Sequence, residues 1–134
     1  MPPGRKAVKI GATQVTRRAR PEQQIQRAIV QHYRLRAAPG VFMFAVPNGG
    51  YRRRVEAAIM KGTGTVAGVP DTVWIKAGRA YFLEIKAPGG RLSEAQEQAL
   101  IALRAAGAMA THCHGLDQAL RILEGWQLLR GSSS

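Results

Sequence analysis

Residues 68–90, GVPDTVWIKAGRAYFLEIKAPGG, decide the fold of this 134-residue chain. Two runs rich in β-branched and aromatic residues, DTVWIK (71–76) and RAYFLEIK (79–86), flank Ala77-Gly78, and this pattern predicts a β-hairpin. Charges interrupt the pattern, because Asp71 opens the first run and Glu84 and Lys86 lie inside the second. Burying such groups without partners is costly, so these three charges require an explanation.

The remaining elements are predicted from hydrophobic spacing and from helix and turn signals. We expect a helix from Pro21 to about Leu35, a buried strand over 41–47, a helix opened by Ser93 and ended by Gly107, a strand over 108–114 and a short helix after it. Residues 52–62 fit either a short helix or an irregular excursion. The order helix, strand, hairpin, helix, strand, helix predicts an α/β fold with a mixed central β-sheet flanked by helices.

The length fits one domain, which we place at residues 20–130. Residues 1–19 are basic and contain proline and glycine, so we expect a flexible N-terminal arm, and we expect residues 131–134 to be a disordered tail. The single cysteine, Cys113, excludes an internal disulfide and fits a reducing compartment. No apolar run is long enough to cross a bilayer, and the N-terminus lacks the apolar region of a secretory signal. We therefore expect a soluble, cytoplasmic protein.

The charge of the chain is strongly positive, at +12 with 20 Lys and Arg against 8 Asp and Glu. Such an excess causes self-repulsion in the compact state, which predicts an anionic partner. Nucleic acid is favoured over a membrane surface, because no long basic amphipathic helix is present. A generally cationic surface without a specific partner is the alternative.

Glu84 and Lys86 are two residues apart in a strand, so their side chains share one face of the sheet. Asp71, at the start of the neighbouring strand, can reach the same side. An ion pair in which Lys86 bridges the two acids is one explanation. The other is metal-assisted phosphodiester cleavage, since Mg²⁺ prefers hard oxygen ligands and a nearby lysine can position water or stabilise an anionic transition state.

Two further residues have more than one interpretation. Glu22 lies within the apolar stripe formed by Ile25, Ile29 and Tyr33, where it faces the packing partner of its helix or favours the helix N-terminus electrostatically. Gln96 follows Ser93 by three residues, which is a capping-box pattern, and it is also placed to lie at the edge of the charged cluster.

The spacing of these residues resembles a known family. Pro70-Asp71, Glu84-Ile85-Lys86 and a following Gln96 resemble the PD-(D/E)XK nuclease signature. The wider run, GVPD and then FLEIKAPGGRLS, is similar to VRR-NUC domains, the virus-type replication-repair nucleases. The resemblance covers roughly residues 20–123 and implies a restriction-endonuclease-like core.

The resemblance also implies roles for individual residues. Asp71, Glu84 and the backbone carbonyl of Ile85 would bind the catalytic Mg²⁺ (or Mn²⁺), and Glu22 would join them, either directly or through a water. Lys86 would orient or activate the attacking water, and Gln96 would lie at the site edge. The implied activity is a metal-dependent DNA endonuclease of the DNA-repair type, acting as a homodimer on branched DNA such as Holliday junctions, with a phage or prophage origin. A non-catalytic nucleic-acid-binding module, a flap or restriction-like nuclease, and an RNA-directed enzyme are the alternatives.

Other residues have weaker signals. Tyr51 beside the three arginines after it offers a stacking ring next to phosphate-binding cations, or it belongs to an exposed basic loop. The residues expected to contact nucleic acid are Tyr51, Arg52, Arg53, Arg54, Lys61 and Arg91. KGTGTVAG (61–68) lacks the spacing of a P-loop and fits a flexible loop. His112-Cys113-His114 suggests zinc, but successive residues of a strand point to opposite sides, so the three cannot all face one ion and a structural strand end is favoured.

Overall fold

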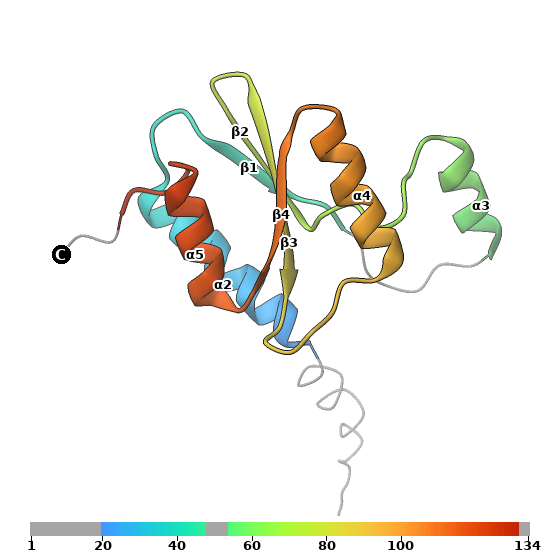
Figure 1. The fold of residues 1–134 in the computed structure, drawn as a ribbon, viewed down its shortest axis with the longest axis horizontal. Helices are drawn as coiled ribbons and strands as arrows, with labels where there is room; N and C mark the ends of the chain where they lie inside the picture. The colour runs from blue at the N-terminus through green and yellow to red at the C-terminus, as the bar shows by residue number, and fades with distance from the viewer. Residues whose placement is uncertain (1–19, 48–53, 132–134) are drawn as a thin grey trace, which may run out of the picture.

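The computed structural model describes residues 20–47 and 54–131. Its elements follow one another as α2 (Pro21–Arg36), β1 (Phe42–Ala45), α3 (Arg54–Gly62), β2 (Thr72–Lys76), β3 (Arg79–Lys86), α4 (Glu94–Ala105), β4 (Met109–His114) and α5 (Leu116–Gly125) (Figure 1). The expected hairpin, both later helices and the last strand are confirmed. Residues 54–62, which the sequence left undecided, form the helix α3.

The four strands form one mixed sheet in the order β1-β2-β3-β4. β1 pairs with β2 and β2 with β3 in antiparallel fashion, while β3 and β4 are parallel. The turn between β2 and β3 is formed by Ala77 and Gly78, which both have positive φ angles, 52° and 77°. Two consecutive left-handed residues give a turn whose twist matches the flanking strands. The parallel pair needs a crossover, which α4 provides.

The helices cover both faces of the sheet, with α2 and α5 together on one side and α4 on the other (Figure 1). The main core lies on the α2 and α5 side. Its buried members are Ile29, Trp74, Leu83, Ile85, Cys113, Ala119, Leu123, Leu128 and Leu129. The expected α/β class, a mixed sheet flanked by helices, is therefore confirmed.

Thr72 is a buried polar residue of this core, with no exposed surface. Its hydroxyl donates to the Leu83 carbonyl at 3.0 Å and accepts from the Trp74 indole N–H at 2.9 Å. Because buried polar groups are costly without partners, this chain of two hydrogen bonds fixes how β2 lies against β3. It does so at the residue that directly follows Asp71.

The expectation of a buried strand at 41–47 is wrong in both length and burial. β1 spans four residues, and the side chains of Phe42 and Phe44 are 61% and 42% exposed. The physical reason is position, because β1 is an edge strand and α4 crosses the sheet at the β4 end. An apolar run alone does not distinguish a central strand from an uncovered edge.

No helix within residues 20–47 and 54–131 is both long enough and apolar enough to span a membrane.

Candidate active site

The candidate site lies on the α4 face of the sheet, where β3 ends. Side chains alternate along β3, so Leu83 and Ile85 enter the core on one face while Glu84 and Lys86 lie on the other. Glu84 is almost fully buried, with 2% of its surface exposed. A carboxylate so deep in the fold is expensive unless other groups compensate for its charge.

Asp71 lies directly before β2 and reaches the end of β3. Its Oδ2 accepts a hydrogen bond from the Ile85 amide N–H at 2.9 Å. Burial raises the pKa of Glu84 to about 8, and the neighbouring Asp71 carboxylate adds to this rise through repulsion. The two acids expected to act together are therefore brought together.

Lys86 supplies positive charge to this acidic pair. Its Nζ lies 3.9 Å from Glu84 Oε2 and 4.0 Å from Glu22 Oε2, and the Lys86 side chain is 12% exposed. Glu22 comes from the first turn of α2, and Ile29 of the same stripe is buried in the core. The packing of α2 thus turns the Glu22 carboxylate toward Lys86, with Glu22 about half exposed, and its role as a metal ligand stays a prediction.

Gln96 makes both of the interactions that the sequence allowed, the helix cap and a contact with the charged cluster. Its Oε1 accepts from the Ser93 backbone N–H at 2.9 Å, and the Ser93 Oγ accepts from the Gln96 N–H at 3.1 Å, which completes a capping box at the start of α4. The same Gln96 side chain donates from Nε2 to Glu84 Oε2 at 2.9 Å. Because the helix cap uses the side-chain oxygen of Gln96, the side-chain nitrogen of Gln96 faces Glu84.

Gly68 explains how the GVPD segment meets α4. Its φ is +81°, and a Cβ at this position would lie 2.4 Å from the Ala95 carbonyl carbon and 2.7 Å from the Gln96 nitrogen. Only glycine allows this backbone contact. The contact sets the segment that carries Asp71 against the helix start that carries Gln96.

The donor set can be compared with the needs of a divalent ion. Among the described residues, no group of three or more His, Cys, Asp or Glu side chains is arranged to hold a metal. Two carboxylates are present, however, and the buried Glu84 Oε1 has no hydrogen-bond partner. Mg²⁺ needs only one or two carboxylates from the protein, since water and substrate phosphate complete its shell. The Asp71 and Glu84 pair therefore fits Mg²⁺ with few protein ligands, and a multi-residue cage is absent from the described chain.

The residues expected to bind nucleic acid are only partly described. Tyr51, Arg52 and Arg53 lie outside the described residues, and Arg54 begins α3 without a described side chain. Lys61 in the last turn of α3 and Arg91 before α4 are both exposed. Their contact with nucleic acid stays a prediction.

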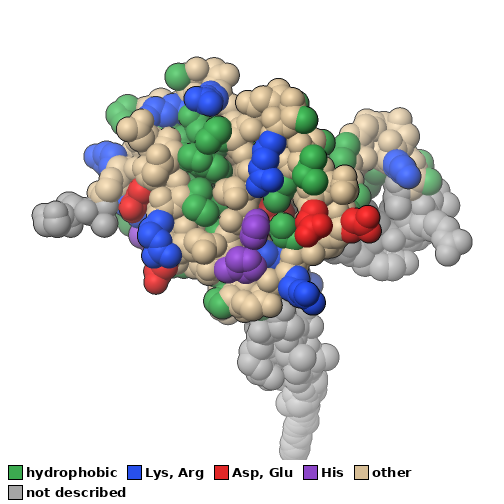
Figure 2. All heavy atoms as spheres, viewed as in Figure 1, with side chains coloured by type: hydrophobic (Ala, Val, Ile, Leu, Met, Phe, Trp, Pro, Cys, Tyr) green, Lys and Arg blue, Asp and Glu red, His purple; other side chains and the backbone are tan. Residues whose placement is uncertain are grey.

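Two histidines lie beside the candidate site, and the sequence did not predict this position. His112 and His114 are the register partners of Glu84 and Lys86 on β4, with their rings 5.0 Å apart, while Cys113 between them is buried in the core. Figure 2 shows histidine side chains at the surface between α5 and α4, next to acidic side chains. Burial lowers the pKa of His112, and His114 and Arg104 lower it further. The parallel register that brings these rings beside Lys86 has no signal in a single sequence.

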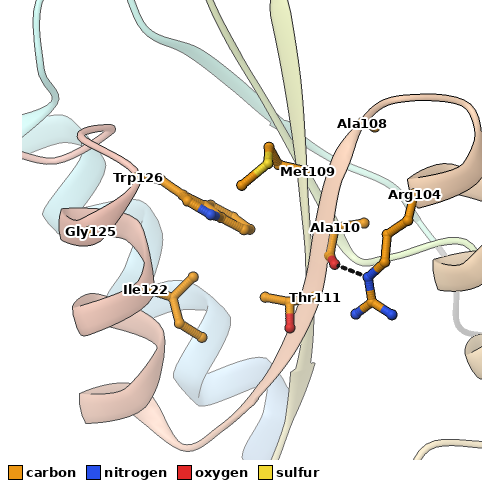
Figure 3. A pocket seen from close by; sticks show the side chains of 8 residues that line it. All are labelled: Arg104, Ala108, Met109, Ala110, Thr111, Ile122, Gly125 and Trp126. Carbon is orange, nitrogen blue, oxygen red and sulfur yellow. Dashed lines mark hydrogen bonds between the residues drawn. The ribbon is translucent and has the colours of Figure 1, made fainter.

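A separate hollow of about 560 Å³ lies along β4, between α5 and the end of α4 (Figure 3). Trp126, Ile122 and Met109 form its apolar wall, and Arg104 lies at its rim. None of the predicted site residues lines it. The hollow is therefore distinct from the charged cluster.

Comparisons with known proteins agree with this fold. The family model of the VRR-NUC domain matches residues 20–117. A solved structure titled "VRR_NUC domain protein" superposes with a TM-score of 0.67 at 23% sequence identity, covering 81% of this chain and 88% of that one. This likeness supports a restriction-endonuclease-like core. No curated protein matches the chain.

Proposed function

Since the chain belongs to the VRR-NUC family, a family of nucleases, we propose that it is a divalent-metal-dependent DNA endonuclease that hydrolyses phosphodiester bonds. The proposal depends on one observation, which is the convergence of Asp71, Glu84 and Lys86 at the end of β3. A structural ion pair alone would not need a second acid that raises the pKa of Glu84. It would also not leave the buried Glu84 Oε1 without a partner.

Asp71 and Glu84 would hold Mg²⁺ or Mn²⁺ together with the Ile85 carbonyl, and Glu22 would contribute through a water. When bound, the ion supplies Lewis-acid activation of water and positive charge beside the phosphoryl oxygens. The unpartnered Glu84 Oε1 and the Asp71 carboxylate are the protein groups available for it. Two adjacent carboxylates become tolerable when a cation is shared between them.

Lys86 acts as the fixed positive charge of the reaction. With Nζ about 4 Å from two carboxylates, the ammonium is held where it can donate to the attacking water or to a non-bridging phosphate oxygen. Water attacks the phosphorus in line, the 3′ oxygen leaves and takes up a proton, and the product carries a 5′ phosphate. Gln96 acts through Glu84, because its Nε2 fixes the orientation of that carboxylate.

DNA binding would depend on phosphates and on DNA shape. The net charge of +12 favours the polyanion, and exposed cations such as Lys61 and Arg91 offer phosphate contacts. We propose branched or junction-containing DNA as the preferred substrate and a homodimer as the active form, since two symmetric incisions require two sites.

A substrate panel tests the proposal. Linear duplex, flap, single-stranded and four-way-junction DNA would be incubated with Mg²⁺, with Mn²⁺ and with EDTA. Lys86→Ala would be compared with Lys76→Ala, whose ammonium donates to the Gln127 carbonyl away from the site. We expect cleavage that requires the ion, favours the junction and is lost in Lys86→Ala, while DNA affinity is kept. DNA binding without cleavage of any substrate would indicate a non-catalytic module, and equal cleavage in EDTA would exclude the proposed metal dependence.

A further inference from the structure

The hollow along β4 combines an apolar wall with a cation. Its volume of about 560 Å³ is within the range of small-ligand sites in proteins, and Trp126, Ile122 and Met109 supply the apolar wall (Figure 3). Arg104, from the last turn of α4, lies at the rim. Among the described residues, no Asp or Glu lines the hollow. An occupant that matches it needs an apolar or aromatic group together with a negative charge.

The Arg104 guanidinium is held in place and still has donors to offer. Its Nε donates to the Ala110 carbonyl at 2.7 Å, as Figure 3 shows. Within residues 20–47 and 54–131, neither Nη1 nor Nη2 of Arg104 has a hydrogen-bond or ion-pair partner. A guanidinium that is fixed through Nε loses little further freedom when its terminal nitrogens bind, and its planar N–H groups match the oxygens of a phosphate. Arg104 therefore offers a preformed contact for a phosphate group.

Trp126 gives the apolar wall a fixed aromatic ring. The centroid of its ring lies 5.4 Å from that of Tyr81, at an interplanar angle of 45°, and the indole packs against the main core. The Trp126 backbone N–H donates to the Ile122 carbonyl at 2.9 Å, which holds this residue at the end of α5. Nucleobases stack on aromatic side chains with little dependence on sequence. A fixed indole that borders a hollow is a surface on which such a base can stack.

The hollow and the candidate active site lie along the same strand. Ala110, whose carbonyl holds Arg104, precedes His112 by two residues, and His112 is the register partner of Glu84. Two residues of a strand span about 7 Å, and one strand of stacked nucleic acid rises about 3.4 Å per nucleotide. Along the strand direction, a phosphate on Arg104 would therefore lie about two nucleotides from one at Glu84. The sequence of β4, MATHCH, contains no acid that would repel the backbone between them.

We propose that Arg104 and the hollow bind one nucleotide of the substrate strand, with a phosphate on Arg104 and an unpaired base stacked on Trp126. This inference rests on the proposed function, because it identifies a part of the same substrate about two nucleotides from the scissile phosphate. A nucleotide fits the hollow, since it carries an aromatic plane and a negative charge and the chain has a net charge of +12. An apolar peptide would leave the guanidinium without a partner.

The nucleotide subsite would give the protein a preference among DNA structures. In a continuous duplex the neighbouring bases cover both faces of each base, and taking one base out of the stack costs free energy. This cost is smallest for bases that are already unpaired. The subsite therefore favours flaps, branch points and single strands over continuous duplex, and Arg104 and Trp126 are specificity-determining residues for the proposed cleavage.

Tryptophan emission tests the base contact in the full chain, which has two tryptophans. Trp74 has no exposed surface, whereas Trp126 borders the hollow, so a change in emission on binding reports on Trp126. The chain would be titrated in EDTA with a short oligothymidylate, with an abasic strand of the same length and with a duplex hairpin. We expect quenching by the oligothymidylate alone, and about tenfold weaker binding of the abasic strand by anisotropy. Equal quenching by the abasic strand or the duplex, or none by the oligothymidylate, would overturn the inference.

Salt dependence separates a phosphate contact of Arg104 from a merely structural role. Arg104→Met removes the charge, and Arg34→Met, at an exposed residue in the last turn of α2, is the matched control. The log–log slope of oligothymidylate affinity against salt should flatten by about 0.7 for Arg104→Met and stay that of the parent for the control. An unchanged slope for Arg104→Met would refute the phosphate contact. If this variant does not fold, the emission of the parent still decides between the outcomes.

The proposed function can fail separately. If the oligothymidylate quenches Trp126 and the slope flattens for Arg104→Met, but no DNA is cleaved with Mg²⁺ or Mn²⁺, the nucleotide subsite stands and the nuclease proposal is wrong. If DNA is cleaved in a reaction that requires Lys86 but the quenching is absent, the nuclease proposal stands and the subsite is wrong. If both stand, Arg104→Met should raise KM for a flap substrate several-fold and leave kcat largely unchanged.

Discussion

Replacing Glu84 by glutamine should remove most of the pH dependence of folding in the metal-free protein. The pKa of Glu84 is raised from an ordinary value of 4.5 to about 8, first by burial and then by Asp71. An acid with a raised pKa in the folded state binds more protons there than in the unfolded state. Its contribution to stability is therefore full below about pH 4.5 and is lost as the pH rises to about 8.

The size of the effect follows from the same two values. A difference of about 3.5 in pKa corresponds to up to about 5 kcal/mol of unfolding free energy. Because Glu84 is 2% exposed, solvent screens little of it. Glutamine carries no charge at any of these pH values and keeps an oxygen that can accept the Gln96 hydrogen bond. Glu84→Gln should therefore be markedly more stable than the parent near pH 8 and similar to it near pH 5.

Urea unfolding in EDTA at both pH values, for the parent and Glu84→Gln, measures this effect. The control is Glu94→Gln, an exposed acid in the first turn of α4. The lowered pKa of His112 acts in the opposite direction around pH 6.5, and it cancels in the difference between the parent and the variant. Added Mg²⁺ should stabilise the parent near pH 8 more than the variant. If the parent and Glu84→Gln lose stability equally as the pH rises, the assignment of the buried charge to Glu84 is wrong.

Three further substitutions test the contacts that position the site residues. Gly68→Ala should destabilise the fold by several kcal/mol because its Cβ would meet helix backbone, whereas Gly64→Ala, with φ of +104° but open space around it, should cost less in a thermal melt. Thr72→Val should cost about 1–3 kcal/mol in urea unfolding, since it removes two buried hydrogen bonds and leaves the Trp74 indole N–H without its partner. Gln96→Glu should keep the helix cap but place a carboxylate oxygen against Glu84 Oε2 where an N–H had donated, so it should slow cleavage and lower the melting temperature near pH 8; an unchanged cleavage rate would remove Gln96 from the site.

Much of the fold follows from local signals that are strong in this chain. Ala77-Gly78 between two apolar runs predicts the hairpin, and Ser93 with Gln96 predicts the start of α4. The exposure of β1 could not be predicted, because it depends on where α4 crosses the sheet. That arrangement is set by the whole fold and not by residues 41–47.

The candidate site, like the fold, could be predicted from the sequence only in part. Alternation along β3 predicts that Glu84 and Lys86 share a face, and the geometry agrees. The two functions of Gln96 appeared as alternatives because a sequence does not show that one amide can use its oxygen and its nitrogen for different partners. The contact of Gly68 with α4 and the place of His114 beside Lys86 both depend on long-range register, which residue spacing does not report.

The Gln96 amide caps α4 through its oxygen and holds Glu84 through its nitrogen. The geometry of the candidate site therefore depends on whether the first turn of α4 is ordered. Helix ends fray at temperatures where the rest of a protein is intact, and each opening of the first turn of α4 would release the Glu84 carboxylate at the same moment. On warming, the rate of cleavage should therefore decline below the melting temperature, while the ellipticity is still that of the native fold.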